Sequence, residues 1–449
     1  MNIFYLSSST ITSQKANSVQ VMKICDAFSE LGHNVVLFAR KNNKDFNNDS
    51  NDIKKYYGIK NNIVVHLIKS SSIRFIGGLE YGHKVLKIIK ALKIKPDLLY
   101  GRNLYALINC LHLNKPIIYE SHTAPGIGKK TLEYYLFSKP QFKKLIVINQ
   151  ALFNYYKNNF KIFKKYPEKL CLAPDGAVIN YNLINNNTNK TPVIGYAGSL
   201  YPGKGIETII EIAKIMPEYI FKVAGGTQEQ IKTFKRIKSD NVVLTGYITP
   251  SNIPEFLSGC NILLAPYSKE VYTENYKKNN IVNWMSPLKI FEYMASKKPI
   301  VASNLPAIKE ILEDNKTALL VDYDSILDWK KAIVKLLCKP DFTKNLSENA
   351  FNEFLDKYTW SKRAEKVLEN VQTKRLINSK STTIKTIKQN SSKNTTHKNV
   401  ISLENKINNQ QTKLFSNDSL KEAKISYINN IDKPVILHII GDLNVGGAE

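Results

Sequence analysis

Short apolar runs alternate with longer amphipathic stretches along the first part of the chain. Residues 2–6 form an apolar run, and residues 7–13 form a predicted loop that is rich in serine and threonine. A helical period of apolar positions begins at Val19 and ends at Gly32, and the apolar run 35–38 follows directly. Because parallel strands need a crossover connection, usually a helix, this order predicts a βαβ unit.

The alternation continues through two series of predicted elements. The strands expected in the first series are residues 63–68, 98–100, 117–119, 145–148 and 170–173. The strands expected in the second series are residues 193–197, 219–224, 242–245, 262–265, 299–302 and 318–321. Helices are expected near residues 206–216, 252–258, 287–296, 306–313 and 325–338. This pattern predicts an α/β protein with two facing, Rossmann-like, doubly wound domains and a ligand crevice at the carboxyl ends of their strands.

Composition separates the two series. The asparagine-rich stretch 180–190 has little apolar surface to bury, and it predicts an interdomain linker. We therefore expect an N-terminal domain over residues 1–180 and a C-terminal domain over residues 190–356. A chain of 449 residues with 43% hydrophobic residues is long enough to bury the cores of two such domains.

Charge and cysteine content restrict where the protein acts. The formal net charge of +26 is compatible with a solvated basic surface or with attraction toward anionic lipids and nucleotide substrates. The five cysteines are scattered without close pairs, which argues against a zinc cage or a disulfide framework and favours the cytoplasm. No run approaches the roughly 18 uninterrupted apolar residues of a spanning helix. Any membrane contact is thus expected to be peripheral, on the inner face of the cytoplasmic membrane.

The composition changes again near the end of the chain. Residues 373–433 consist mainly of Lys, Asn, Ser, Thr and Gln without a sustained apolar period, and they predict a disordered polar and basic linker. This stretch holds 12 Lys and Arg against 4 Asp and Glu, so most of the basic excess belongs to the folded part. Residues 434–449 become apolar and glycine-rich again.

A glycine loop follows the predicted strand 193–197. It reads Gly198-Ser-Leu-Tyr-Pro-Gly203-Lys204-Gly205 and opens a helix that is rich in isoleucine. Gly205 stands where a P-loop carries its magnesium-binding Ser or Thr, which argues against a Walker nucleotidase. A glycine loop and a helix N-terminus still offer N–H groups and partial positive charge to a phosphate, and Lys204 adds a full charge. The alternative is a structural turn with a solvated lysine.

A second motif reads Ser286-Pro287-Leu-Lys289-Ile-Phe-Glu292-Tyr-Met-Ala. Pro287 is expected in the first turn of a helix, and Lys289 and Glu292 lie three residues apart on one helix face. One interpretation is a surface ion pair. In the other, Glu292 accepts hydrogen bonds from ribose hydroxyl groups while Lys289 meets a phosphate.

A third motif, Glu120-Ser-His122, directly follows the predicted strand 117–119. A single histidine often has only a structural role. The position of His122 at a strand end, before the loop residues Pro125 and Gly126, favours a functional role at the crevice.

Together and in this order, the three motifs resemble those of the family 4 (group 1) glycosyltransferases, whose GT-B fold has two facing Rossmann-like domains. The similarity extends over residues 1–372 and includes Lys-Pro-Ile-Val-Ala-Ser at 298–303 and Ala-Pro-Asp-Gly at 173–176. Tyr-Thr-Trp at 358–360 resembles the start of the helix that crosses back to the first domain in this family, here residues 357–372.

The resemblance implies a retaining, metal-independent, hexosyltransferase-like enzyme without a cofactor. Its expected partners are a nucleotide diphosphate sugar and a glycan or lipid-linked acceptor, in the synthesis of lipopolysaccharide, O-antigen or capsule, with peripheral contact to an anionic membrane. The acceptor hydroxyl is expected to attack from the face that the diphosphate leaves. Electrostatic stabilisation of the leaving diphosphate would supply much of the catalysis.

The same resemblance assigns the site residues. Lys204 and Lys289 would bind the donor diphosphate, Glu292 would hold the ribose, and His122 would lie beside the transferred sugar, so that His122, Lys204 and Lys289 form the catalytic set. The expected donor site consists of Gly198, Ser199, Gly203, Lys204, Gly205, Ser286, Pro287, Lys289 and Glu292.

The chain departs from the family pattern at two positions. Trp284 stands eight residues before Glu292, where the family usually has a glutamate that contacts sugar hydroxyls. Ser199 stands where many relatives have a phosphate-binding arginine. The candidates that remain for selecting the sugar are Glu270, Glu274 and Asn283.

An Asp322-Tyr-Asp324 sequence matches the metal-binding motif of other glycosyltransferases, but its place before a predicted helix fits a turn and a helix cap better. No metal site is therefore expected. Residues 434–449 resemble the opening of another family 4 enzyme, so we expect residues 373–433 to tether a second module. The alternative is a tail that packs as an edge strand.

Two other classes of protein remain as rivals. A catalytically silent scaffold that binds glycan or nucleotide is supported by Trp284 and Ser199. A nucleic-acid-binding protein is suggested by the charge, but residues 1–372 contain no recognisable nucleic-acid module, so no nucleic-acid partner is expected.

Overall fold

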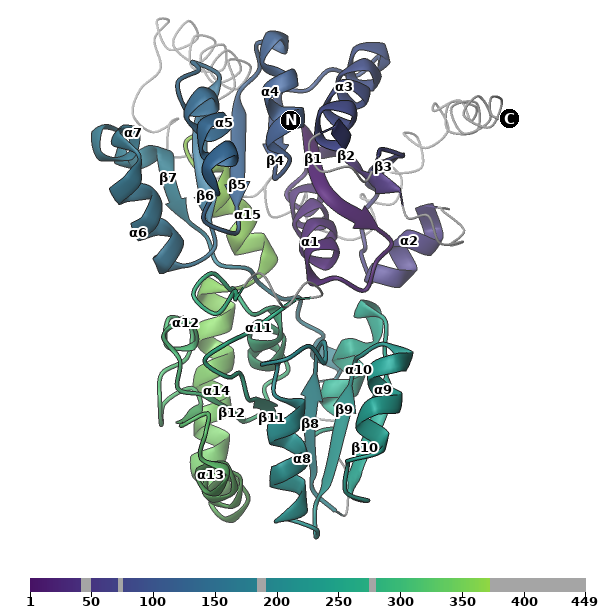
Figure 1. Ribbon diagram of the computed structural model, residues 1–449, viewed down its shortest axis with the longest axis vertical. Helices are drawn as coiled ribbons and strands as arrows, with labels where there is room; N and C mark the ends of the chain where they lie inside the picture. The colour runs from purple at the N-terminus through teal and green to yellow at the C-terminus, as the bar shows by residue number, and fades with distance from the viewer. Residues whose placement is uncertain (42–49, 72–75, 184–190, 274–279, 372–449) are drawn as a thin grey trace, which may run out of the picture. The chain divides into compact units, whose positions relative to one another are not determined.

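The structure is a computed structural model whose two parallel sheets are labelled in Figure 1. The residues that it describes are 1–41, 50–71, 76–183, 191–273 and 280–371. The predicted linker 373–433 and the predicted second module at 434–449 lie outside the described residues, as do residues 184–190 of the predicted interdomain linker. Within the described part, no helix is long and apolar enough to cross a membrane.

The first sheet has seven parallel strands in the order β3-β2-β1-β4-β5-β6-β7. Its strands are β1 (Asn2–Ile11), β2 (Asn34–Lys41), β3 (Val64–Ile68), β4 (Leu98–Gly101), β5 (Ile117–Ser121), β6 (Phe142–Val147) and β7 (Leu170–Leu172). Its helices are α1 (Ala16–Glu30), α2 (Ser50–Tyr57), α3 (Ile76–Ala91), α4 (Leu104–Asn109), α5 (Ile127–Phe137), α6 (Gln150–Asn159) and α7 (Lys161–Lys165).

The second sheet has six parallel strands in the order β10-β9-β8-β11-β12-β13. Its strands are β8 (Val193–Ala197), β9 (Ile220–Ala224), β10 (Val242–Gly246), β11 (Ile262–Ala265), β12 (Ile300–Ser303) and β13 (Leu319–Val321). Its helices are α8 (Ile206–Lys214), α9 (Gln228–Lys235), α10 (Ile253–Ser258), α11 (Leu288–Ala295), α12 (Pro306–Lys309) and α13 (Ile326–Cys338). Two doubly wound parallel sheets confirm the predicted fold class.

Two further helices end the described part of the chain. The 18-residue helix α14 (Pro340–Lys357), which the sequence analysis did not predict, contributes Phe351 and Phe354 to the core that contains Phe291 of α11. The last helix, α15 (Trp360–Leu368), packs against α1, and Trp360 belongs to the same buried cluster as Phe28 of α1. The chain therefore passes from the second sheet back to the helices of the first.

The prediction of a loop over residues 7–13 is wrong for most of that stretch, because β1 continues to Ile11 and pairs there with the end of β2. Ser7 and Ser9 are buried, and their polar groups are satisfied locally. The Oγ atom of Ser7 accepts a hydrogen bond from the Ser9 amide at 2.9 Å, and the Ser9 hydroxyl donates to the carbonyl of Asn17 at 3.3 Å. Such internal bonds let serine enter a buried strand end.

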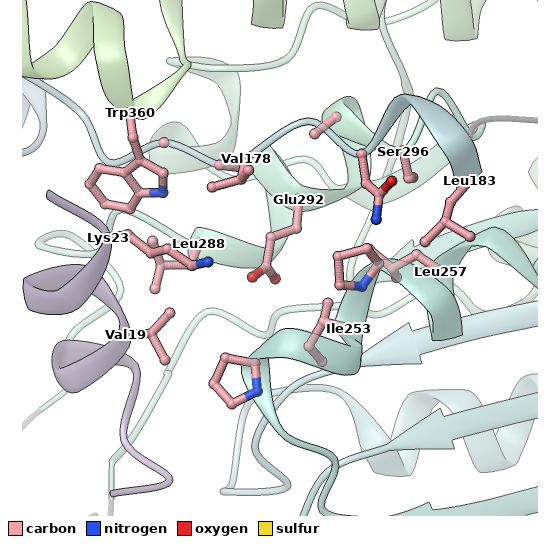
Figure 2. A pocket seen from close by; sticks show the side chains of 16 residues that line it. Val19, Lys23, Val178, Leu183, Ile253, Leu257, Leu288, Glu292, Ser296 and Trp360 are labelled. Atoms are coloured by element: carbon pink, nitrogen blue, oxygen red, sulfur yellow. The ribbon is translucent and has the colours of Figure 1, made fainter. Parts of the chain in front are cut away.

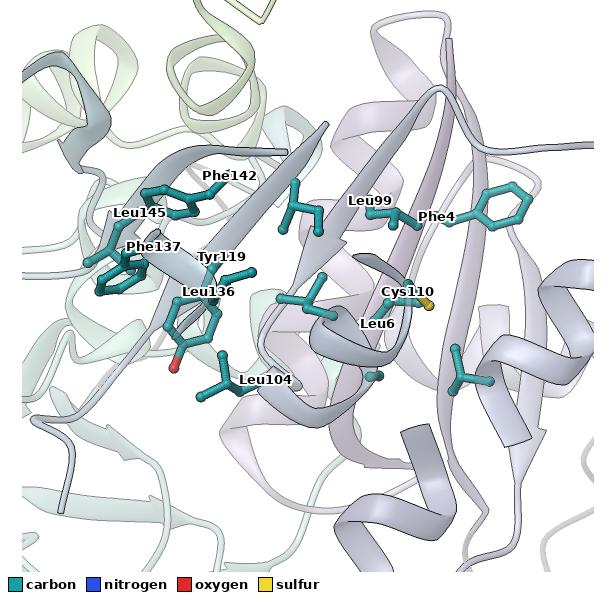
Figure 3. Packing of buried hydrophobic residues seen from close by; sticks show 14 of the residues in the cluster. Phe4, Leu6, Leu99, Leu104, Cys110, Tyr119, Leu136, Phe137, Phe142 and Leu145 are labelled. Atoms are coloured by element: carbon teal, nitrogen blue, oxygen red, sulfur yellow. The ribbon is translucent and has the colours of Figure 1, made fainter. Parts of the chain in front are cut away.

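The apolar side chains of β1 alternate between the two faces of the first sheet. Phe4 and Leu6 belong to the buried cluster on one face, shown in Figure 3, and Ile3 and Tyr5 belong to the cluster on the other. Helices cover both faces, as expected for an all-parallel sheet, so the carboxyl ends of the strands are left to carry polar chemistry.

Candidate functional site

The glycine loop after β8 lies directly against the loop after β11. Gly203 and Gly205 have φ angles of +78° and +100°, in the region that favours glycine. A Cβ atom at Gly203 would lie 1.8 Å from the carbonyl oxygen of Glu270, and one at Gly205 would lie 2.1 Å from that of Pro266. Glycine is therefore required at both positions because two backbones approach each other closely.

Two lysines from different elements converge on the ring of Tyr267. The Nζ atom of Lys204 lies 5.4 Å from the ring centroid, and that of Lys289 lies 4.9 Å from it. The Nζ atom of Lys289 also lies 3.7 Å from the centroid of the Tyr196 ring. A Cβ atom at Gly198 would come within 2.8 Å of this nitrogen, so the glycine leaves room for the ammonium group. The structure thus brings the two predicted lysines together on an aromatic platform.

Burial opposes the charge of both lysines. Lys289 is 8% exposed, and its Nζ atom is buried without a hydrogen-bond partner among the described residues. Burial, and then the charge of Lys204, holds the pKa of Lys289 well below its ordinary value. Burial also lowers the pKa of Lys204 to about 8. An anion bound here would stabilise both charged forms, so the arrangement suits a phosphate or diphosphate group.

Glu292, one turn after Lys289 on α11, lines a pocket beside α1 (Figure 2). Lys23 of α1 lines the same pocket, and Leu288 and Trp360 give it apolar walls. Burial raises the pKa of Glu292, while the charges of Lys23 and Lys289 act in the opposite direction. The pocket therefore presents one carboxylate and one lysine amine within a largely apolar surface, which suits a ligand with hydroxyl groups.

The structure corrects two details of this motif. No ion pair joins Lys289 and Glu292 among the described residues, because Lys289 is buried under aromatic rings instead of lying on the surface. Pro287 precedes the first helical turn as the N-cap of α11, since its ψ angle of 100° is extended and its carbonyl accepts from the Ile290 amide at 2.9 Å. The neighbouring Ser286 accepts a hydrogen bond from the amide of Asp175 at 3.0 Å.

His122 lies at a polar junction that leads to the second domain. Its Nε2 atom is hydrogen-bonded to the carboxylate of Glu120, and its side chain is 14% exposed. Burial, and then the charge of Arg102, lowers the pKa of His122 to about 4, so the ring is neutral at pH 7. The side-chain atoms of His122, Glu120 and Asp175 that could bind a metal all lie within 4.8 Å of one another. The backbone amide of Asp175 is hydrogen-bonded to Ser286 in the second domain.

These three side chains are of the kinds that bind metal ions, but a cation already lies among them. The Nη2 atom of Arg363 lies 3.0 Å from Oε1 of Glu120 and 3.9 Å from Oδ1 of Asp175. The charges are thus arranged as an ion-pair network around a guanidinium group, which fits a divalent cation poorly.

The Asp322-Tyr-Asp324 sequence forms the turn and helix cap that its position predicts. The amide of Asp324 donates to the carboxylate of Asp322 at 3.2 Å, and Ser325 caps α13 by accepting a hydrogen bond from the amide of Asp328 at 3.3 Å. Asp322 therefore has a local structural role in the described part of the chain.

The loop before α11 is attached to the first domain. The ring of Trp284 packs edge-on against that of Tyr155, with centroids 6.2 Å apart and planes at 80°. The side-chain amide of Asn149 donates to the carbonyls of Asn283 at 3.0 Å and Met285 at 3.2 Å. Where relatives are expected to have a sugar-binding glutamate, this chain therefore has an interdomain contact.

Ser199, the second departure from the family pattern, and Glu270, a candidate for sugar selection, both have local contacts in the structure. Ser199 is exposed, and its carbonyl accepts a hydrogen bond from the hydroxyl of Tyr196 at 2.8 Å. Glu270 accepts one from the hydroxyl of Tyr272 at 2.8 Å. Glu274 lies outside the described residues.

Sequence reasoning missed several residues that build the site. Tyr196 and Tyr267 form the platform under the lysines, and Asp175 and Arg363 surround His122. Asp175 belonged to a motif already noted, Ala-Pro-Asp-Gly, but its contacts come from segments far away in sequence. Tyr196 lies in β8 and Tyr267 follows β11, and buried tyrosines at such positions are ordinary core residues, so nothing in the sequence marked the platform.

Comparisons with known proteins agree with this geometry. Residues 191–339 match the family described as Glycosyl transferases group 1. The chain is 27% identical over 172 residues to the alpha-galactosylglucosyldiacylglycerol synthase of Streptococcus pneumoniae, covering 36% of this chain and 41% of that protein. It is 23% identical over 270 residues to the poly(ribitol-phosphate) alpha-N-acetylglucosaminyltransferase of Staphylococcus aureus, covering 58% of this chain and 49% of that protein.

The fold is similar to that of the Anabaena protein HepE, whose structure contains UDP and glucose. The TM-score is 0.60 at 15% identity, with 83% of this chain and 99% of that chain covered. This similarity, with the two parallel sheets, shows the GT-B fold. The matched part of the chain therefore covers less than half the length of each of these two curated relatives.

Proposed function

Because residues 191–339 match the group 1 glycosyltransferases, we propose that the chain transfers a sugar from a nucleotide diphosphate to a glycan or glycolipid acceptor with retention of configuration. The donor would bind at the glycine loop and α11, and the acceptor would approach from the His122 side. We further propose a role in the synthesis of cell-surface polysaccharide.

One observation carries this proposal above the others, namely the lysine pair over Tyr267. Lys204 and Lys289 are held beside the same ring, and Lys289 has no hydrogen-bond acceptor among the described residues. Burying an ammonium group without an acceptor costs free energy. A ligand that supplies negative charge would explain why a lysine stands at this buried position. A diphosphate leaving group gains negative charge as its bond breaks, and it would therefore be stabilised most at the transition state.

The pocket beside Glu292 supports a nucleoside on the same donor. A carboxylate can accept hydrogen bonds from both ribose hydroxyl groups, and the apolar walls near Leu288 and Trp360 suit the uncharged part of the ligand. Because Lys289 and Glu292 lie one turn apart on α11, one rigid helix would position the diphosphate and the ribose together.

The proposed reaction exchanges one bond at the anomeric carbon. The bond to the diphosphate oxygen breaks, and its electron pair leaves with the phosphate. The acceptor hydroxyl oxygen forms the new bond on the same face, and its proton passes to the departing phosphate. Lys204, Lys289 and the N–H groups of the glycine loop would take over the charge stabilisation that a metal supplies elsewhere.

The names of the relatives support the stereochemistry and the acceptor. Both curated relatives are named for alpha linkages, and an alpha product from an alpha-linked donor means retention. One name specifies a glycolipid product and the other a poly(ribitol-phosphate) acceptor. These names support an acceptor that belongs to a larger lipid-linked or polymeric molecule.

Exposed side chains of helix α5 support a peripheral membrane contact. Ile127, five residues after His122, is 92% exposed, and Tyr134 and Tyr135 are each 48% exposed. The Nζ atom of Lys139 lies 4.0 Å from the centroid of the Tyr135 ring. Exposed apolar and aromatic side chains beside lysines suit an anionic lipid surface.

Sedimentation with lipid vesicles tests this membrane contact. The protein is expected to bind anionic vesicles and not zwitterionic ones, and Ile127→Ser should weaken the binding.

The test of the proposed function is a screen of the purified chain with UDP- and GDP-sugars. The cognate donor should raise the melting temperature, since a ligand at about 100 times its Kd adds about 2.7 kcal/mol of stability. The donor that stabilises the protein should then be consumed in the presence of a glycan or glycolipid acceptor. NMR of the first product formed should show the anomeric configuration of the donor, and an inverted product would refute retention.

The interdomain contact of Trp284 favours one alternative, a catalytically silent scaffold that binds nucleotide or glycan. A scaffold would bind UDP, but it would neither transfer nor hydrolyse any sugar nucleotide. Release of UDP that depends on Lys204 and Lys289 excludes it.

A further inference from the structure

Glu120, on β5, is a buried carboxylate with four hydrogen-bonding partners. Its Oε1 atom is bonded to the amide nitrogen of Gln20 at 2.8 Å and to Nη2 of Arg363 at 3.0 Å. The Nε2 atom of His122 bonds to the same oxygen, and the Tyr100 hydroxyl donates to Oε2. Three of the four groups therefore meet at Oε1, and the fourth donates to Oε2.

The partners of Glu120 fix its charge. Arg363 can only donate, and Gln20 is oriented because its Oε1 atom accepts from Nη1 of Arg102 at 3.3 Å, which leaves its NH₂ group toward Glu120. Burial opposes ionisation of Glu120, but the Arg363 guanidinium and the bond from His122 outweigh burial and hold its pKa below the ordinary value. An ionised carboxylate has no proton to donate, so the hydrogen of the bond to His122 lies on Nε2.

The consequence for His122 is a defined tautomer. A neutral imidazole that carries its proton on Nε2 has a lone pair on Nδ1, which can only accept a hydrogen bond. No hydrogen bond to Nδ1 is found among the described residues, and the side chain is 14% exposed. His122 therefore presents an acceptor, and not a donor, to a ligand.

The guanidinium group that bonds Glu120 belongs to Arg363, on the last described helix, α15. Arg363 is separated from Glu120 by 243 positions in sequence and is only 3% exposed. Its Nε atom donates to the carbonyl of Pro174 at 3.0 Å. Thr359 caps the same helix by accepting from the amide of Lys362 at 3.2 Å, so the arginine is fixed at both its backbone and its side chain.

We propose that Arg363 is a positioning residue for His122. Through Glu120 it fixes the imidazole as the Nε2–H tautomer, so that Nδ1 accepts a hydrogen bond from a hydroxyl group of the sugar bound in the site. The identity of the ligand rests on the proposed function, whereas the tautomer rests on the contacts of Glu120 alone. The helix that returns from the second domain thereby contributes to sugar recognition in the first.

Other titratable groups face His122 and Glu120, and their titration must be distinguished from that of His122 in any pH experiment. They are Tyr5, Cys25, Tyr100, Arg102, Asp175 and Arg363. Burial raises the pKa of Asp175 to about 7, so it titrates closest to neutral pH. Asp175→Asn removes that titration and serves as the background in which the pH dependence of His122 is measured.

The direct test is ¹⁵N NMR of the full chain labelled at histidine, with the His122 signals assigned by comparison with His122→Asn. Nitrogen shifts and their couplings to the ring protons distinguish the two tautomers and the imidazolium. The expected result is the neutral Nε2–H form from pH 6 to pH 8. An Nδ1–H tautomer, or an imidazolium at pH 7, would overturn the proposal.

Arg363→Met tests the role of the arginine, and Lys362→Met is the matched control because Lys362 is an exposed neighbour on the same helix. Loss of the guanidinium removes a positive charge that lowers the pKa of His122, so its pKa should rise and the imidazolium should appear at higher pH. Unchanged His122 signals in Arg363→Met would contradict the proposal. If this variant does not fold, Glu120→Gln tests the link through the carboxylate instead. Loss of the negative charge should lower the pKa of His122, and because a neutral amide no longer fixes the proton on Nε2, the Nδ1–H tautomer should appear; unchanged His122 signals would contradict the proposal.

Kinetics separate positioning from a merely structural role. With the sugar nucleotide found in the donor screen, Arg363→Met should lower kcat by about tenfold, as expected for loss of one well-placed hydrogen bond. Affinity for UDP alone should stay within about twofold, because the lysine pair and Glu292 are untouched. The acid limb of the activity profile should move to higher pH. A uniform loss of activity at every pH, with weaker UDP binding, would indicate a structural role instead.

The two proposals fail in different ways. If the protein binds no nucleotide and consumes no sugar nucleotide, the proposed function fails, together with the part of this inference that concerns sugar, while the NMR measurement still decides the tautomer. If transfer occurs but His122 has the other tautomer, the inference fails alone.

Discussion

The ammonium nitrogen of Lys289 lies 3.7 Å from the centroid of the Tyr196 ring and is hydrogen-bonded to no oxygen among the described residues. The ring face stabilises the cation in part, but it does not replace the hydrogen bonds of water. Keeping Lys289 charged therefore costs stability in the free protein, which is why its pKa is lowered, and a bound anion would reduce that cost.

Lys289→Met tests this relationship. The substitution keeps the apolar stem and removes the unpaired charge, so the melting temperature should stay equal or rise while UDP affinity falls roughly 10- to 100-fold. Isothermal titration with UDP measures the affinity. Lys298→Met is the matched control, since Lys298 is equally buried in the same domain but lies over neither tyrosine ring. Wild-type UDP affinity in Lys289→Met would refute the diphosphate site.

Glu292→Gln should weaken the binding of UDP because the contact with the ribose is lost, while the contacts with the diphosphate are kept. The wild-type chain should bind UDP more tightly than 2′-deoxy-UDP by about tenfold, and Glu292→Gln should lose most of this preference. Competition titration with the two nucleotides gives the ratio. Glu255→Gln, an exposed position on α10, should keep the preference. If Glu292→Gln discriminates as the wild type does, the carboxylate does not contact the ribose.

The pH dependence of UDP binding should follow Lys204. Its pKa is lowered to about 8, so the free lysine is charged below that pH and neutral above it. A diphosphate favours the charged form, so UDP binding should take up protons near pH 8 and weaken as the pH rises, by up to about tenfold per unit at higher pH. Calorimetry in buffers of different ionisation enthalpy measures the proton uptake. Lys204→Arg should reduce it, because arginine stays charged. Equal uptake in both proteins would assign the titration elsewhere.

Transfer should continue without a divalent cation. The lysine pair supplies positive charge where the diphosphate would lie, and the Asp322 carboxylate accepts a hydrogen bond from the Asp324 amide in a turn before α13. EDTA should therefore leave the rate unchanged within about twofold, and a variant with both Asp322→Asn and Asp324→Asn should transfer normally. Activity that EDTA abolishes and manganese restores would show that a metal takes part.

Trp284 and Tyr155 should be energetically coupled. Their rings meet edge-on across the two domains, and such pairs contribute about 0.5 to 1.5 kcal/mol beyond burial of area. A double-mutant cycle of Trp284→Ala and Tyr155→Ala, followed by urea denaturation, measures the coupling. Additive effects of the two substitutions would mean that the contact contributes nothing. Trp284→Glu, which restores the family residue, should lower stability because it places a charge against an apolar ring.

Local pattern determined most of the fold. The strand 193–197 and the start of the helix at residue 206 were predicted from apolar periodicity and a glycine loop, because parallel strands are buried on both faces and read as apolar runs. The prediction of a loop over residues 7–13 was wrong because polar residues there hid a strand. Their serines look like a loop, yet they enter a strand because internal hydrogen bonds satisfy them.

The sequence by itself also determined which residue types are present for a diphosphate, Lys204 and Lys289, since a motif is a property of neighbours in the chain. Only the tertiary structure decided that both lysines meet over Tyr267, that Trp284 holds a loop to the first domain, and that Arg363 reaches Glu120. These contacts join positions far apart in sequence. They depend on how sheets and helices pack, and local periodicity carries no information on that packing.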